Sequence, residues 1–348
     1  MDSRESFELA LQSLSQLCNK DRRMGAPYGR AFKTLRLSVH GHAPGTLYKY
    51  FNVENASRSI QDLRKGLLYL ASPKDFDDDY DVRPQYNADV INRRMNAQVT
   101  PQNIADTFKF LGQFLPSTME AAENIHNEMV RRAGGFGEFK KEYIDETIVS
   151  LPKRIEAFRN SVRCACLAEE QDSDLMWGLY ASKHKGFVAA YNTPLSTPAC
   201  SCVSSTCPGS ACERFGFPLT LIPVLYKGRK DISDYSDVYG GSTSLIPYLT
   251  EHLYLAVVMS TAYKGARWEM EREWRLVTLT CNRADGSTMY ARMTPTALYL
   301  GSKISVGHEA KLIEVAQELR IPVYKEVVTY EASSDAMVFE QVPPRRST

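Results

Sequence analysis

Residues 46–71 read TLYKYFNVENASRSIQDLRKGLLYLA and predict a strand, a helix and a second strand in close succession. The first strand is expected at 46–51, where aromatic and apolar residues are frequent. Asn55 can cap a helix, and the apolar residues after it recur at helical spacing until Gly66 ends the pattern. The apolar run 67–71 then predicts a buried strand.

The pattern along the rest of the chain indicates one mixed α+β core over residues 46–331, with a mixed β-sheet and flanking helices. A polar segment with helical periodicity at 90–160 predicts a helical insertion into this core. Residues 1–45 are expected to form a helical and loop extension. Residues 332–348, which end in proline and arginine residues, are expected to form a flexible tail.

Within the core, the remaining strands and helices are predicted from the spacing of apolar residues and from turn residues. Strands are expected at 162–167, 187–191, 219–226, 274–280, 288–293 and 322–329, and helices at 174–183, 245–263 and 306–319. Asp285-Gly286, between two of these strands, is typical of a hairpin turn.

The composition is that of an ordinary globular protein and excludes disordered and collagen-like chains. The chain has 348 residues, of which 43% are hydrophobic and 24% charged, and its formal net charge is +1. This balance gives no overall attraction to nucleic acid or to an acidic membrane. The apolar run Leu253–Met259 is far shorter than the roughly 20 residues of a membrane helix, and residues 1–14 do not read as a secretory signal. We expect a cytoplasmic protein without a membrane partner.

Four cysteines are concentrated in one predicted loop, at 198–214. Their spacing is C-x-C-x4-C-x4-C, formed by Cys200, Cys202, Cys207 and Cys212. Four thiolates match the tetrahedral ligand set of structural zinc, which would staple the loop rather than react. The spacing differs from the common zinc-finger patterns, so unligated or oxidisable thiols remain the alternative.

Three blocks of sequence, taken in order, resemble a bacterial family known as domain of unknown function 2971. They are residues 47–78, residues 175–187 (LMWGLYASKHKGF) and residues 268–276 (WEMEREWRL). The first block departs from the family pattern, because Asp77-Asp78-Asp79 stands where the family has Asn-Asp-Pro. The resemblance implies a component of a phage-defence, abortive-infection or toxin system, but it implies no reaction.

The order of strand, helix, glycine and strand also resembles, more distantly, the entry of ADP-ribosyltransferase-like folds. In such folds a residue of the first strand grips the ribose of NAD, and Lys49, beside Tyr48, stands at that place. A Glu-x-Glu pair before a later strand corresponds to Glu271 and Glu273. The resemblance therefore implies NAD as the substrate, with Lys49 and Tyr48 in contact with it.

The chemistry of NAD cleavage explains why two glutamates would be needed. Breaking the nicotinamide bond leaves an oxocarbenium-like ribose, and the carboxylate of Glu273 would stabilise this cation. Glu271, two residues earlier, would point to the same face if both residues lie in extended chain, and would orient or deprotonate an acceptor. Alternatively, both glutamates only form ion pairs with nearby arginines at a sheet edge.

Aromatic and basic residues of the second block are further candidates for contact with NAD. Trp177 and Tyr180 have the spacing of one helical face and could form a shelf for nicotinamide or a base, or could simply pack in the core. His184 and Lys185 follow the predicted helix. They could bind phosphate, although a histidine at this place is also a common helix end.

Three classes of function stay open at this point. The first is an NAD-consuming ADP-ribosyltransferase or NAD glycohydrolase that acts as a defence or toxin effector on an unidentified protein or nucleic acid acceptor. The second is a catalytically silent domain that senses a nucleotide or a phage component. The third is a metal-dependent nuclease that uses the acidic cluster Asp77–Asp81. The sequence does not indicate the oligomeric state.

Overall fold

The computed structural model describes residues 3–20, 39, 43–112, 116–193, 219–233, 257–279, 289–328 and 337–343, without the side chains of 15–20, 107, 110–112 and 118. The chain divides into two compact units. Unit 1 consists of residues 1–82, 159–229 and 257–348, and unit 2 of residues 83–158 and 230–256. Among the described helices, none combines the length and the apolar character that crossing a membrane requires.

Unit 1 is built on a large sheet, which confirms the expected mixed α+β core. Within the described residues, eight strands follow the order β10-β9-β8-β4-β1-β3-β6-β5, and β2 and β7 form a separate two-stranded sheet. The neighbours in the large sheet are antiparallel except for the parallel pair β8 and β9. The strands are β1 (Thr46–Phe51), β2 (Leu67–Leu70), β3 (Val162–Ala168), β4 (Phe187–Asn192), β5 (Thr220–Pro223), β6 (Glu273–Leu279), β7 (Met289–Arg292), β8 (Ala297–Leu300), β9 (Val323–Val327) and β10 (Val338–Gln341).

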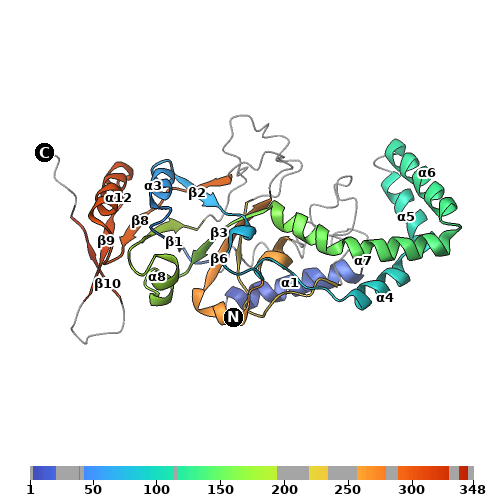
Figure 1. Cartoon of the computed structure of the whole chain (residues 1–348), viewed down its shortest axis with the longest axis horizontal. Helices are drawn as coiled ribbons and strands as arrows, with labels where there is room; N and C mark the ends of the chain where they lie inside the picture. The colour runs from blue at the N-terminus through green and yellow to red at the C-terminus, as the bar shows by residue number, and fades with distance from the viewer. Residues whose placement is uncertain are drawn as a thin grey trace. The chain divides into compact units, whose positions relative to one another are not determined.

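Helices cover this sheet, as expected for an α+β protein. Figure 1 shows α8 on one side of β1 and α3 together with α12 on the other. The α-helices of unit 1 include α1 (Ser3–Lys20), α3 (Ala56–Arg64), α8 (Asp174–Tyr180) and α12 (Val306–Leu319), and its 3-10 helices include η1 (Pro73–Asp75) and η3 (Ala266–Glu271). Helix α1 buries Phe7, Leu11 and Leu14, so the expected N-terminal extension contributes to the core.

The sheet is nearly interrupted between β1 and β3, and this feature creates space for a site. β1 pairs with β4 over its whole length, and β3 pairs with β6 over its whole length. In the described part of the sheet β1 and β3 share the single pair Tyr48–Ala168. Further along β3, Cys164 pairs instead with Ala71, just after β2. The two strands therefore diverge between these contacts.

Helix α8 is held against β1 by a turn that brings the main chain unusually close. Ser182, Lys183 and His184 all have positive φ, so the chain reverses immediately after the helix. A Cβ atom on Gly186 would lie 2.1 Å from the carbonyl oxygen of Phe51, which only glycine avoids. This close approach fixes the place of α8 beside the diverging strands.

Two expectations about the C-terminal half of the chain were wrong. The strands at 274–280 and 288–293 do not pair as a hairpin, because β6 joins β3 and β5 in the large sheet while β7 pairs with β2. The expected flexible tail at 332–348 contains β10, which pairs with β9 at the end of the sheet. A four-residue strand at a sheet edge buries little apolar surface and leaves a weak sequence pattern.

Unit 2 corresponds to the helical segment expected at 90–160. Its helices are α4 (Ala88–Gln98), α5 (Pro101–Gly112), α6 (Pro116–Arg132) and most of α7 (Phe136–Ser161). Its buried apolar core is made by α4 and α7 together with a loop residue, and consists of Ile91, Met95, Ile144, Leu151, Ile155 and Ile232. Asn87 caps α4, since its side-chain oxygen accepts from the amides of Asp89 and Val90.

Candidate functional site

Glu271 and Glu273 lie side by side, although the chain between them is not extended. Glu271 is the last residue of η3, Arg272 has the left-handed conformation with φ 44°, and Glu273 is the first residue of β6. Both carboxylates nevertheless bind one ammonium group, because Lys264 Nζ lies 2.5 Å from Glu271 Oε2 and 2.9 Å from Glu273 Oε2. The expected convergence of the two side chains therefore arises from a helix end followed by one left-handed residue, and not from strand alternation.

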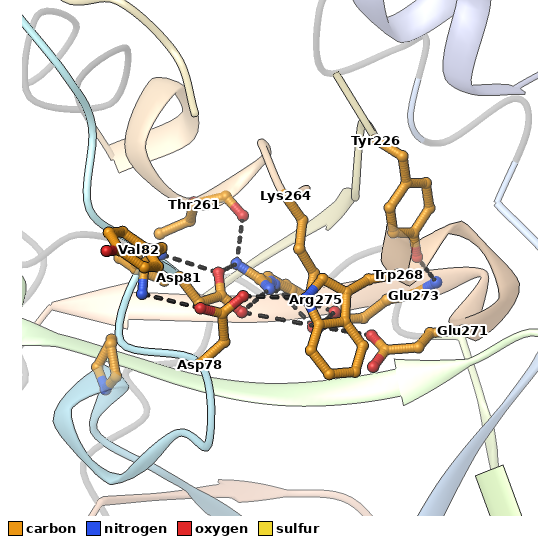
Figure 2. Close-up of polar contacts among 12 residues, drawn as sticks. Asp78, Asp81, Val82, Tyr226, Thr261, Lys264, Trp268, Glu271, Glu273 and Arg275 are labelled. Carbon is orange, nitrogen blue, oxygen red and sulfur yellow. Dashed lines mark hydrogen bonds and ion pairs between the residues drawn. The ribbon is translucent and has the colours of Figure 1, made fainter. Parts of the chain in front are cut away.

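Arg275 fixes Glu273 from the opposite side. Its Nε donates to Glu273 Oε1 at 2.7 Å, and its two terminal nitrogens donate to the Asp81 carboxylate at 2.8 and 2.6 Å. Figure 2 shows this guanidinium between the two acidic side chains, with a third acceptor, the carbonyl oxygen of Thr261, at 2.8 Å. Arg275, Asp81 and Glu273 are all buried, so these contacts are shielded from water.

The buried polar cluster has more carboxylates than cations. We call it the β6 cluster; it consists of Asp81, Lys264, Glu271, Glu273 and Arg275. Three carboxylates against two cations leave a formal charge of −1 if every group is ionised. An additional hydrogen bond reaches Glu271 from α8, where the Tyr180 hydroxyl donates to Glu271 Oε1 at 2.5 Å. The cluster is therefore suited to hold a ligand that carries a positive charge or hydroxyl donors.

The two glutamates experience opposite electrostatic environments. Burial alone would raise the pKa of Glu273, but Arg275 and Lys264 hold that pKa well below its usual range. Burial and the neighbouring Glu273 raise the pKa of Glu271, against the opposing effect of Lys264. The surroundings therefore favour the ionised form of Glu273, and they favour protonation of Glu271 relative to a free glutamate.

A pocket of about 530 Å³ opens where β1 and β3 diverge, and the β6 cluster lies along it. Most of the residues predicted to act together line this pocket: Tyr48, Lys49, Tyr180, Glu271 and Glu273. Further lining residues come from α3 and its N-cap, from β2 and the segment after it, and from η3 and the chain before it; they include Asn55, Arg58, Ser59, Asp62, Tyr69, Asp75, Asp77, Asp78, Lys264 and Trp268. Residues from several separate elements of unit 1 therefore face the same pocket.

Trp268 provides the aromatic wall beside the acidic cluster. Its indole nitrogen donates to Asp78 Oδ2 at 2.9 Å, and Lys264 Nζ lies 5.1 Å from its ring centre. Burial opposes ionisation of Asp78, but the bonds from the Tyr80 amide and from Trp268 lower the pKa of this carboxyl group. The indole ring is thus fixed at its edge, and it can stack against a flat ligand ring.

Other candidates from the second sequence block are not among the residues that line the pocket. Trp177 is fully buried, its indole nitrogen donates to the Gln171 carbonyl at 2.7 Å, and its ring stacks on His184. His184 Nδ1 lies 3.0 Å from Glu326 Oε2, so the histidine already has an acidic partner. Lys185 is exposed in the turn after α8. The structure brings Tyr180 to the pocket and leaves these three residues elsewhere.

The metal sites considered from sequence receive no support from the described residues. Cys200, Cys202, Cys207 and Cys212 lie outside the described part of the chain. Where the structure describes side chains, no group of three or more His, Cys, Asp or Glu residues is placed to hold a metal ion. Within the acidic segment after β2, Asp81 binds Arg275 and Asp78 binds Trp268, so these carboxylates already have partners.

Sequence reasoning named Arg275, with Arg267 and Arg272, only as a possible ion-pair partner of the glutamates, and it missed Lys264. Arg275 follows Glu273 by two residues in β6, so strand alternation was the available signal that both side chains lie on one face. Lys264 lies outside any regular element and leaves no comparable pattern. Asp81 was considered only as part of a cation site, and its partner Arg275 is 194 positions away in sequence.

Comparison with known proteins supports one of the resemblances seen in the sequence. A family model described as "Protein of unknown function (DUF2971)" matches residues 176–276. The matched range includes Tyr180, Lys264 and the Glu271–Glu273 pair, although it covers less than a third of the chain. Neither the curated proteins nor the solved structures contain a match.

Proposed function

We propose that the protein cleaves NAD at its nicotinamide bond, as an ADP-ribosyltransferase or NAD glycohydrolase, and that this activity serves a defence or toxin function. The observation that carries the proposal is the pair of glutamates at the pocket. One is kept ionised by Arg275 and Lys264, and the other has a raised pKa. Two carboxyl groups with pKa values moved apart are typical of enzymes that cleave glycosidic bonds through a cationic intermediate.

In the proposed step, the bond between ribose C1′ and the nicotinamide nitrogen breaks, and its electron pair stays on that nitrogen. Nicotinamide leaves as a neutral ring, and the ribose becomes an oxocarbenium ion. The ionised Glu273 carboxylate, in a site shielded from water, stabilises the developing positive charge. An oxygen of water or of an acceptor then bonds to C1′, and its proton passes to Glu271.

The aromatic and acidic surroundings fit the departing group. Trp268 and Tyr180 line the pocket near the glutamates, and an aromatic wall suits the flat nicotinamide ring. The surplus negative charge of the β6 cluster favours the cationic pyridinium of NAD over a neutral ring. Hydrolysis and transfer share this first step, so the geometry supports both with equal weight.

Incubation of the purified protein with NAD tests the proposal. We expect free nicotinamide, detected by chromatography, together with ADP-ribose or an ADP-ribosylated acceptor when a bacterial lysate is added. NAD should also raise the melting temperature by mass action. Binding without nicotinamide release would favour the sensor function instead. Absence of both binding and release at millimolar NAD contradicts the proposal.

A further inference from the structure

We infer that the pocket contains a second subsite, formed by Arg58 and Tyr69 and held in place by Tyr290, that binds the nucleoside diphosphate half of a dinucleotide. The inference deepens the proposed function and rests on it for the identity of the whole substrate. Binding of ADP by the subsite, however, requires no turnover and can be measured by itself. Arg58 and Tyr69 both line the pocket.

Arg58 is held in a defined position by two tyrosines. Its guanidinium carbon lies 4.5 Å from the centre of the Tyr69 ring, and its Nη2 donates to the Tyr290 hydroxyl at 3.1 Å. The tyrosines are direct partners across β2 and β7, and their ring centres are 5.8 Å apart. A guanidinium stacked on one ring and hydrogen-bonded to the next is pre-organised for a planar, bidentate contact.

One terminal nitrogen of this guanidinium is available to an anion in the part of the chain that the structure describes. Among the described residues, Arg58 Nη1 has no acceptor, and half of the side chain is exposed. Asp62 is the acidic group near it, with Oδ2 3.9 Å from Arg58 Nε. At this separation the pair with Asp62 is loose and leaves no hydrogen bond between the two side chains. Arginine in such a setting is the side chain that best matches phosphate oxygens.

Lys49 lines the same pocket as Arg58 and supplies a second cation. Strand alternation directs Lys49 away from Tyr48 and Tyr50, which pack toward α8. In the part of the chain that the structure describes, its ammonium group has no hydrogen-bond or ion-pair partner. The β1 and α3 residues of the pocket thus contribute two cations, Lys49 and Arg58, against the one carboxylate of Asp62, whereas the β6 cluster has three carboxylates against two cations.

The class of ligand follows from this distribution of charge. A phosphate group carries the negative charge that Arg58 and Lys49 can bind, and the partly exposed Tyr69 ring offers an aromatic surface to a base. The β6 cluster, in contrast, favours a cation. A molecule with a cationic ring at one end and a nucleoside diphosphate at the other matches both features.

Calorimetric titration of the full-length protein with ADP tests the inference. We expect ADP to bind, and Arg58→Ala to weaken its affinity by about tenfold or more, the loss typical of a charge-assisted contact. Arg64→Ala is the matched control, because Arg64 belongs to the same helix but binds Glu314 and Glu318 on α12. This control should bind ADP like the parent protein, and melting curves should show both variants folded.

Titration with pyrophosphate separates a nucleotide subsite from a simple anion site. ADP should bind more tightly than pyrophosphate, and Tyr69→Ala should reduce this difference. Equal affinities for the two ligands overturn the inference, as does an Arg58→Ala protein that binds ADP like the parent. ADP binding that depends on Arg58 supports the subsite even if no nicotinamide is released. Conversely, NAD turnover with an unaltered KM in Arg58→Ala contradicts the subsite and leaves the proposed function intact.

Discussion

Trp177 and Tyr180 lie one turn apart on α8, yet only Tyr180 reaches the pocket. Trp177 is enclosed by Tyr50, His184 and Phe339, and its indole nitrogen is satisfied by a main-chain carbonyl. Tyr180 points to the β6 cluster and donates to Glu271. Two residues with the spacing of one helical face can therefore have different roles. In α8, Trp177 packs in the core and Tyr180 faces the pocket.

The charged groups around Trp177 also differ from those of the β6 cluster beside Tyr180. Around Trp177, His184 contacts the single carboxylate of Glu326, which also accepts from the Ser302 amide. In the β6 cluster, three carboxylates share two cations, and the group with the raised pKa lies along the pocket. A closed pair stabilises the fold, whereas a cluster with unbalanced charge retains the capacity to bind a ligand.

The largest effect on stability is expected in the β6 cluster. Arg275→Met keeps much of the side-chain volume but leaves Asp81 and Glu273 buried without their main cation. Loss of one partner of a buried ion pair costs about 3–5 kcal/mol, and urea denaturation should show a decrease of this size. Arg272→Ala is the control, since this exposed neighbour binds Glu169 and Glu170, and its loss should cost about 1 kcal/mol or less. Similar small losses for both variants would contradict a buried network.

A smaller loss of stability is expected when Trp177, the enclosed aromatic residue of α8, is substituted. Trp177→Phe removes ring atoms from a close-packed site and leaves the Gln171 carbonyl without its donor, which should cost about 1–3 kcal/mol. The rate of nicotinamide release at a temperature where the variant is folded should stay at the parental value. A folded Trp177→Phe protein that has lost the activity would show that the core side of α8 takes part in the reaction.

The smallest change in stability is expected when Tyr180, on the side of α8 that faces the pocket, is substituted. Tyr180→Phe deletes the hydroxyl group that donates to Glu271 and should cost about 1 kcal/mol. This hydrogen bond favours the ionised form, so its loss should raise the pKa of Glu271 further. A general base acts only when it is deprotonated, so the acidic limb of the pH–rate profile should move to higher pH. An unchanged profile in this variant would argue against Glu271 as the base.

Much of the fold could be predicted because its elements carry strong local patterns. The strand at 46–51 and the helix at 306–319 were predicted with the bounds that the structure has. β8 and β10 were not predicted, because β8 is largely buried and β10 largely exposed, and neither shows the apolar–polar alternation of a half-buried strand. The pairing of β6 and β7 was predicted wrongly, since a turn sequence indicates that a chain reverses but not which strand becomes its partner.

Site residues that belong to one sequence motif could be predicted. Site residues that only the tertiary structure brings together could not. The Glu-x-Glu pair and Tyr180 came from blocks of resemblance; Tyr180 donates to Glu271, and Lys264 binds both glutamates. Asp81 joins the site by its ion pair with the distant Arg275, and Arg58 is placed by its contacts with Tyr69 of β2 and Tyr290 of β7. Such contacts leave no signal in the spacing of a single sequence.

The most direct test of the account is the rate of nicotinamide release by Glu273→Gln and Glu271→Gln proteins. Both should lose activity by about a hundred- to a thousandfold. Glu273→Gln should also be less stable, because it removes the anion between two buried cations, whereas Glu271→Gln removes the surplus carboxylate and should fold as well as the parent. Loss of release in a fully stable Glu271→Gln protein is the result that the account predicts. Parental rates in either folded variant would contradict it and would remove the glutamate pair from the reaction.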